Sequence, residues 1–304
     1  MDTRRIGSLE VSVVGLGCNN FGPRVDEAGT RAVVDAAIDA GITFLDTADI
    51  YGAHASETFL GRILRGRRDR VVLATKFGMS RGEAIPGGAS AAYIRSSVEG
   101  SLQRLQTDRI DLYQLHEPRP ETPIAETLGA LDELVREGKV REIGCSNFSA
   151  AQLLEAADAA PGARFVCVQN ELSLLDRGDL GEGLAEAGRQ GLAYLPYYPL
   201  ANGLLTGKYR RGEAPPAGTR LDFWYDEDER AEAMAAPVFD RIEALTAFAE
   251  ERGHTLLELA LAWLLAQGPV ASVIAGATKP EQVAANAAAG EWRLRLEDLE
   301  ALPD

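Results

Sequence analysis

Short apolar runs alternate with amphipathic stretches along most of the chain. The apolar runs predict buried strands at residues 13–17, 43–48, 71–77, 110–116, 140–146, 165–170, 191–197 and 270–275. Apolar side chains at helical spacing predict helices at 26–40, 56–64, 90–105, 124–137, 149–159, 179–189, 239–252, 255–267 and 280–288, and another turn or two at 296–302. Ser90 and Ser149 begin two of these stretches as N-caps. The segment 199–237 carries no clear period.

This alternation contains eight strand–helix pairs. Such units place parallel strands side by side, with the helices packed outside them. Eight units in 304 residues fit one α/β domain, residues 1–304, closed as a (β/α)8 TIM barrel. A doubly wound sheet is the alternative, and it would have a GxGxxG turn after the first strand. The chain has GLGCNNFG at 15–22, where the glycine spacing differs, so we favour the barrel.

Composition and charge narrow the classes of partner. The formal net charge of −15 disfavours nucleic acid or an anionic membrane surface, so an anionic ligand would need a local basic patch. No apolar run reaches the roughly 18–20 residues of a membrane span. The N-terminus lacks the apolar core of a secretory signal, and we expect a cytoplasmic protein. Three cysteines and three histidines without metal-ligand spacing predict neither a disulfide framework nor a metal site.

Four ionisable residues follow successive predicted strands. Asp46 ends the second strand and Tyr51 lies in its loop, while Lys76 and His116 end the third and fourth. Taken singly, each has an ordinary explanation as a turn, cap or solvated residue, but in a barrel all four meet at one rim. An ammonium lowers the pKa of a nearby phenol from about 10, and a carboxylate holds the ammonium in place. With His116 bonded to the reacting oxygen, this set could protonate a carbonyl oxygen while hydride reaches the carbon.

Seven motifs stand in order along the chain. They are GITFLDTADIYG (41–52), ATKF (74–77), LHEP (115–118), IGCSNF (143–148), VQN (168–170), YYPL (197–200) and GATKPEQV (276–283). In these motifs the chain resembles the aldo-keto reductases, and the likeness covers almost its whole length. The resemblance implies a catalytic tetrad of Asp46, Tyr51, Lys76 and His116, with Tyr51 as the general acid.

The resemblance also implies where a nicotinamide cofactor binds. Ser146, Asn147 and Gln169 would bond the carboxamide, and Tyr197 would stack on the ring, since a flat heterocycle favours an aromatic face. Residues 200–208 would wrap the pyrophosphate, and residues 276–286 would hold the adenosine phosphate. The residues expected to make these last two sets of contacts are Leu200, Gly203, Lys208, Gly276, Thr278, Lys279, Gln282 and Asn286.

The sequence therefore predicts an oxidoreductase that reduces a small aldehyde or ketone with NADPH. We favour NADPH over NADH because Lys279, at the start of the last predicted barrel helix, can meet the 2′-phosphate. Two alternatives stay open: NAD-dependent oxidation of a sugar or polyol, and a cofactor-sensing subunit similar to the potassium-channel beta subunits. Tyr198 stands where many relatives have serine, so no polar contact is expected of it. We expect the substrate pocket walls at 19–21, Ile50, Glu117 and 223–225.

Overall fold

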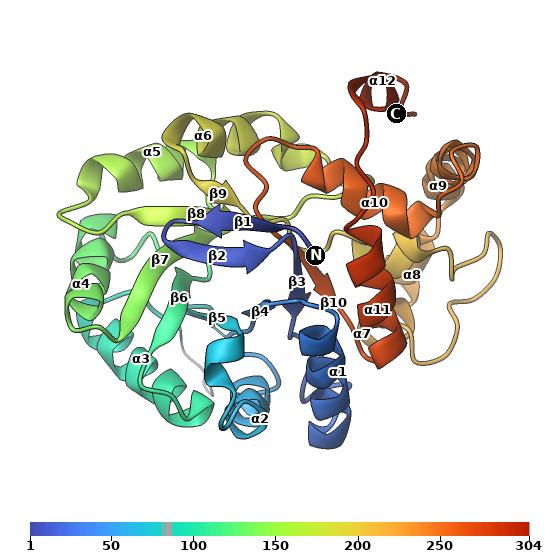
Figure 1. Cartoon of the computed structure of the whole chain (residues 1–304). Helices are drawn as coiled ribbons and strands as arrows, with labels where there is room; N and C mark the ends of the chain where they lie inside the picture. The colour runs from blue at the N-terminus through green and yellow to red at the C-terminus, as the bar shows by residue number, and fades with distance from the viewer. Residues whose placement is uncertain (81, 83–86, 304) are drawn as a thin grey trace.

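Eight parallel strands form the centre of the molecule (Figure 1). The computed structural model describes residues 1–80, 82 and 87–303. In spatial order the strands are β10 (Val273–Gly276), β3 (Val14–Gly17), β4 (Phe44–Asp46), β5 (Val72–Phe77), β6 (Ile110–Leu115), β7 (Val140–Ser146), β8 (Phe165–Gln169) and β9 (Ala193–Tyr194). Tyr194 pairs in parallel with Val270, and the Ile274 amide donates to the Pro196 carbonyl at 3.0 Å, which closes the sheet. The predicted (β/α)8 barrel is confirmed.

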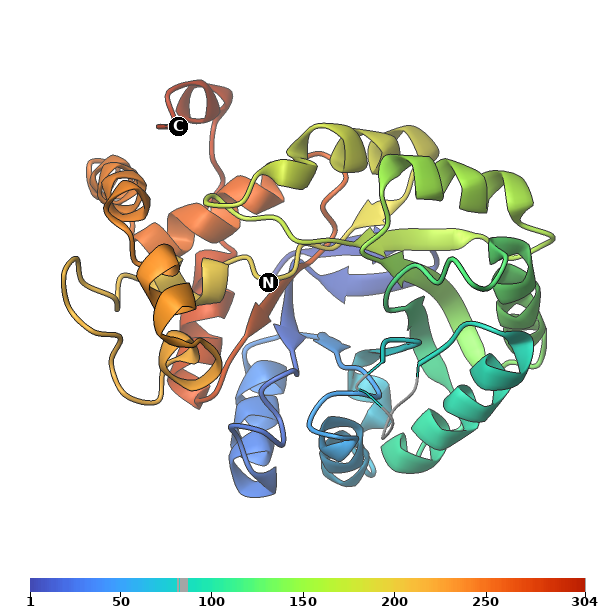
Figure 2. The ribbon, with the colours of Figure 1, turned by 180° about the vertical axis from the view of Figure 1, so that it is seen from behind.

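Helices cover the outside of this sheet, as views from two opposite sides show (Figures 1 and 2). They are α1 (Glu27–Asp39), α2 (Ala55–Ile63), α3 (Ala91–Leu105), α4 (Ile124–Arg136), α5 (Ala150–Ala159), α6 (Glu182–Gln190), α10 (Leu256–Leu265) and α11 (Pro280–Ala289). Helix α9 (Ala236–Glu250) packs on α10, and the short α12 (Leu296–Glu300) stands apart from the sheet near the C-terminus (Figure 1). Both predicted caps are confirmed. Ser90 Oγ accepts from the Tyr93 amide at 3.3 Å, and Ser149 forms a capping box with Gln152.

An antiparallel hairpin, absent from the predicted elements, closes one end of the barrel. Its strands are β1 (Thr3–Ile6) and β2 (Leu9–Ser12), joined at Gly7, whose φ of +56° suits a tight turn. Ile6, Leu9 and Val11 are buried together with inward-facing side chains of the barrel strands. Because this end is plugged, the opposite end, where the parallel strands terminate, is the one available for a site.

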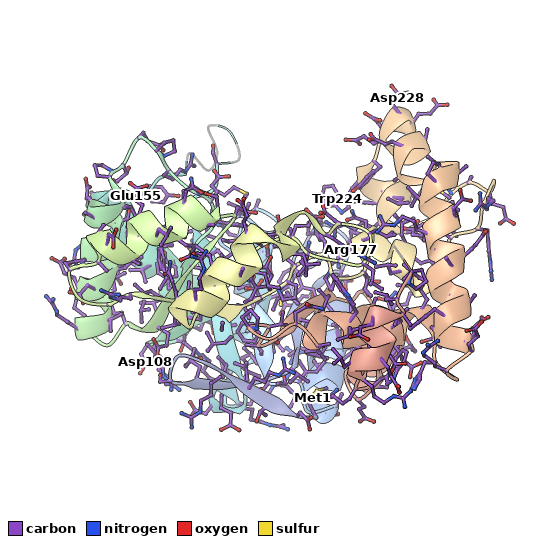
Figure 3. The ribbon with its side chains drawn as sticks, turned by 90° about the horizontal axis from the view of Figure 1, so that it is seen from above. Met1, Asp108, Glu155, Arg177, Trp224 and Asp228 are labelled. Carbon is purple, nitrogen blue, oxygen red and sulfur yellow. The ribbon has the colours of Figure 1, made fainter. Side chains whose placement is uncertain are left out.

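The segment without a clear period contains the turn η3 (Ala201–Thr206) and two short helices, α7 (Arg220–Trp224) and α8 (Glu227–Ala233). Asp226 caps α8 in a reciprocal pair with Glu229. Figure 3 shows Trp224 and Asp228 on the side of the barrel away from Met1 and Asp108. Asp108 precedes β6, so α7 and α8 lie over the carboxyl ends of the strands.

Strand β9 is shorter than the predicted 191–197. Pro196 has no backbone N–H and interrupts the ladder, although Leu195 and Tyr197 still donate to β8 and the loop after it. Among the described residues, none of the helices is long and apolar enough to cross a membrane.

Candidate active site

A cleft of about 970 Å³ lies at the carboxyl ends of the strands. Every predicted site residue except Lys76 lines it: Asp46, Tyr51, His116, Ser146, Asn147, Gln169, Tyr197, Leu200, Gly203, Lys208, Gly276, Thr278, Lys279, Gln282 and Asn286. Lys76 lies behind this lining and is 1% exposed. Residues from both halves of the chain therefore meet at one opening, as the strand-end positions predict.

Asp46, Lys76 and Tyr51 form a connected group at the base of the cleft. Asp46 is the last residue of β4, and Lys76 lies near the end of the neighbouring strand β5. The Lys76 ammonium donates a hydrogen bond to Asp46 Oδ2 and lies 3.3 Å from the Thr47 carbonyl oxygen. Its third contact is Tyr51 Oη, at 3.4 Å. The ammonium thus joins a buried carboxylate to a phenol that faces the cleft.

Burial and charge act in opposite directions on this group. Burial acts to lower the pKa of Lys76, but the Asp46 carboxylate and Tyr51 outweigh it, so that pKa is raised and the amine stays protonated. Burial raises the pKa of the Tyr51 phenol, and the Lys76 charge opposes this only in part. Lys76 therefore acts to lower the pKa of Tyr51, as the sequence predicts, but the pKa stays above its ordinary value because removal of the phenol from water has the larger effect.

His116 is neutral in this environment. Burial, together with the charge of Lys76, holds the pKa of its imidazole well below its ordinary value. The His116 ring lies edge-to-face on Tyr51, with ring centroids 5.8 Å apart. Within the described part of the chain, Nδ1 is buried and has no hydrogen-bond partner. The Asn147 amide donates to the His116 carbonyl at 2.8 Å and so fixes its backbone.

The residues expected at the nicotinamide already bond to protein groups. Ser146 Oγ donates to the Gln169 carbonyl at 2.7 Å, and Gln169 Nε2 donates to Asp46 Oδ1 at 3.0 Å. Tyr197 Oη donates to Asn147 Oδ1 at 2.8 Å, and Asn147 holds a left-handed backbone with φ of +62°. These bonds orient the residues that we expect at the carboxamide and link Gln169 directly to the predicted tetrad.

Among the described residues, three cations that line the cleft lie near one another, namely Lys208, Arg24 and Arg220, and sequence reasoning found only Lys208. Burial and the charges of Arg24 and Arg220 lower the pKa of Lys208. Arg24 donates to the Gly218 carbonyl at 2.5 Å and so joins the first barrel loop to the segment before α7. Arg220 Nε is buried without a partner among the described residues. In a chain of net charge −15, such a group is the local basic patch that an anionic ligand needs.

The start of α11 forms another part of the cleft lining. Lys279 is the exposed N-cap residue of this ten-residue helix. The Thr278 amide and hydroxyl both donate to Gln282 Oε1, at 2.7 and 3.1 Å, so the Gln282 amide nitrogen is the group left to donate outward. Asn286 is buried in the wall beneath. A helix N-terminus with a lysine beside it is suited to a phosphate.

The expected pocket walls are only partly confirmed. Asn19, Asn20, Ile50, Trp224 and Tyr225 line the cleft, whereas Phe21, Glu117 and Phe223 do not. The Phe21 side chain is instead fully buried in the core, and the Phe223 side chain is half exposed to solvent.

Tyr198 is a further lining residue with a polar contact. Its backbone has φ of +50°, and its hydroxyl accepts from Arg220 at 2.7 Å. Of the described residues, no three histidine, cysteine, aspartate or glutamate side chains are grouped so that they could hold a metal ion.

Asp49, two residues before Tyr51, is a buried acid that sequence reasoning passed over. Burial, followed by the charge of Glu57, raises the pKa of its carboxyl to about 7. Ser97 Oγ lies 3.4 Å from Asp49 Oδ2, while Oδ1 has no partner among the described residues. Asp49 therefore carries a proton in the folded protein over a pH range where an exposed aspartate has lost it.

Comparison with known proteins identifies the family. The family model described as the Aldo/keto reductase family matches residues 13–303, and the chain belongs to this family. An uncharacterized oxidoreductase, YrpG, of Bacillus subtilis (strain 168) is 38% identical over 97% of this chain and 92% of its own length. Aldo-keto reductase str7 of Strobilurus tenacellus is 35% identical over 99% of this chain and 91% of its own.

Solved structures agree with this assignment. The aldo-keto reductase AKR11C1 from Bacillus halodurans, in a holo form, is 34% identical with a TM-score of 0.83, covering 99% of this chain and 95% of that one. The glycerol dehydrogenase AKR11B4 from Gluconobacter oxydans is 32% identical with a TM-score of 0.85, covering 99% and 94%. The protein is thus an NAD(P)H-dependent oxidoreductase with an aldo-keto reductase fold.

Proposed function

We propose that the protein reduces a small aldehyde or ketone to an alcohol, with Tyr51 as the general acid and NADPH as the favoured cofactor. One observation carries the proposal. Tyr51 Oη faces the cleft 3.4 Å from an ammonium that is itself buried against a carboxylate. This arrangement supplies a proton at neutral pH and stabilises the phenolate that its departure leaves behind.

Tyr51, Lys76 and His116 each have a separate role at the carbonyl oxygen of the substrate. Reduced nicotinamide, when bound, supplies a hydride to the carbonyl carbon. Tyr51 donates the proton that the oxygen takes up, and Lys76 stabilises the resulting phenolate. Neutral His116 donates a hydrogen bond from Nε2 to the same oxygen and, because its pKa is low, does not compete as the acid.

The cleft fits a phosphorylated dinucleotide in its charge as well as its size. The buried, unpartnered Arg220 Nε beside Lys208 and Arg24 is suited to the pyrophosphate. Tyr197 offers an aromatic face to the nicotinamide, as the resemblance implies. Lys279 at the α11 N-cap meets the extra 2′-phosphate, and this contact is the basis for favouring NADPH.

The test is a matrix of initial rates. Aldehydes, diketones, quinones, sugars and polyols are each assayed with NADPH, NADH and their oxidised forms, and kcat/KM is compared. The highest kcat/KM for a carbonyl with NADPH supports the proposal. Faster oxidation of a polyol with NAD would contradict it and favour the reaction named for the Gluconobacter neighbour.

A further inference from the structure

A polar layer lies across the barrel at the base of the cleft, and two of its four residues line the cleft. Side chains on a strand alternate between its two faces, so residues two apart point inward together. In four strands the deeper inward residue is apolar and packs beneath the layer, while the next one is polar. These pairs are Phe44 and Asp46, Ala74 and Lys76, Leu112 and Gln114, and Cys167 and Gln169. Three of the four polar residues were predicted site residues, and the fourth, Gln114, was not.

Gln114 bonds the carboxylate that holds Lys76. Its Nε2 lies 3.0 Å from Asp46 Oδ1, and Gln169 Nε2 lies at the same distance from the same oxygen. Gln114 Oε1 in turn accepts from Gln169 Nε2 at 3.4 Å. Lys76 bonds the other carboxylate oxygen, Oδ2. Two amides on one oxygen and an ammonium on the other fix the rotation of the carboxylate.

We propose that Gln114 is a positioning residue for the reaction: it orients Asp46 so that Lys76 stays directed at Tyr51. This inference rests on the proposed function. Gln114 is fully buried and does not line the cleft, whereas Gln169 lines it and is expected to bond the cofactor. Gln114 is therefore the amide donor to Asp46 that a bound ligand does not reach.

The amide also acts on charge. Its N–H dipole points at Asp46 with the positive end and takes up part of the carboxylate charge. Without it, Asp46 draws the ammonium more strongly, and less positive potential is left at the Tyr51 phenol. The stronger pull on the ammonium and the weaker positive potential both make the Tyr51 phenolate less stable, so the loss of the amide raises the pKa of Tyr51.

Gln114→Met is the direct test, since methionine fills a similar volume and donates no hydrogen bond. We expect kcat to fall about 10-fold, the lower end of the range for a hydrogen bond to a charged group, with little change in the KM for NADPH. The alkaline limb of the kcat profile should move up by about half a unit to one unit. Leu112→Ala, one layer deeper on the same strand, is the matched control. It should lower the melting temperature and leave the alkaline limb in place.

Gln114→Glu supplies a rescue. Its new carboxyl group, when protonated, donates to Asp46 as the amide does, and when ionised it repels Asp46. We expect kcat near the wild-type value at acid pH and a steep loss as the pH rises. If Gln114→Met does not fold, this variant carries the test, because a residue needed only for packing gives no such acid-dependent rescue.

A titration without turnover separates this inference from the proposed function. The ultraviolet absorbance of tyrosinate is followed with pH, and the curve of each protein is corrected with its own Tyr51→Phe counterpart. An upward shift of the Tyr51 titration in Gln114→Met supports the positioning role even if wild-type protein reduces no carbonyl. Unchanged kcat, pH profile and Tyr51 titration in the folded variant would overturn it.

Discussion

Replacing Lys76 with methionine removes the positive charge that contacts Tyr51 Oη. At 3.4 Å and an effective dielectric constant of about 20, the attraction between an ammonium and a phenolate reaches about 5 kcal/mol, an upper bound. Burial of the ammonium offsets part of it. Loss of an acid–base group costs about 10²–10⁴ in rate, so we expect Lys76→Met to lower kcat by at least about 10²-fold.

The assay follows the cofactor absorbance with a reactive nitrobenzaldehyde, and cofactor affinity is measured separately by fluorescence. Affinity should change little, because Lys76 lies behind the cleft lining. The variant leaves Asp46 buried without its cation, so the double variant Lys76→Met with Asp46→Asn is tested beside it to restore neutrality. Lys139→Met is the matched control, since Lys139 is a surface lysine paired with Glu99 and Glu137. Near-normal kcat in a folded Lys76→Met variant would refute the proton-transfer role.

Three further predictions concern the expected cofactor contacts and the buried acid Asp49. Tyr197→Ala should weaken cofactor binding by at least about 1 kcal/mol, because the stacking on the ring is lost. Tyr197→Phe should weaken binding less, since this variant loses only the hydrogen bond to Asn147. Fluorescence titration with the cofactor measures both affinities. Lys279→Ala should raise the KM for NADPH about 10- to 150-fold and leave the KM for NADH almost unchanged. Arg220→Ala should raise the KM for both cofactors. An equal rise in the two KM values with Lys279→Ala would contradict the contact between Lys279 and the 2′-phosphate. Wild-type protein should lose stability as the pH rises, and Asp49→Asn should abolish this loss. Because the Asp49 pKa is raised to about 7, the folded state keeps a proton that the unfolded chain releases at lower pH, and stability falls through that window. From about pH 5 to pH 8 the unfolding free energy of the variant should rise relative to that of wild type by about 2–3 kcal/mol. Urea unfolding at the two pH values measures this, and the same pH-dependent change in both proteins would refute it.

The strand-end positions of the site were predictable because the barrel fold determines which end of each strand meets the others. Asp46, Lys76 and His116 each follow an apolar run, and the fold then places them at one rim. Gln114 escaped notice because a single glutamine inside an apolar strand gives no signal by itself. Its inward direction follows only when the alternation from Leu112 is combined with the register that pairs it with Lys76.

The irregular segment and the electrostatics were harder to predict. Helix α8 has charged residues at five of its seven positions and alanine at the other two, so it has no apolar stripe, although Asp226 and Glu229 have the spacing of a capping box. Arg24 and Arg220 are far apart in sequence, and only the folded chain brings their charges to Lys208. The pKa of Tyr51 depends on the balance between burial and the Lys76 charge, and burial is a property of the packed structure.

The central claim is that Tyr51 gives its proton to a carbonyl oxygen, and a comparison of wild-type protein with Tyr51→Phe tests it most directly. Each protein is saturated with NADPH and mixed with an excess of a reactive aldehyde, and the rate of cofactor oxidation is recorded. Tyr93→Phe, which alters a tyrosine outside the cleft lining, is the control. The account predicts turnover by wild-type and control proteins and a loss of at least about 10²-fold in Tyr51→Phe at similar NADPH affinity. Equal rates in Tyr51→Phe and wild type would contradict it, as would tight NADPH binding by wild type without turnover, the behaviour of a cofactor sensor.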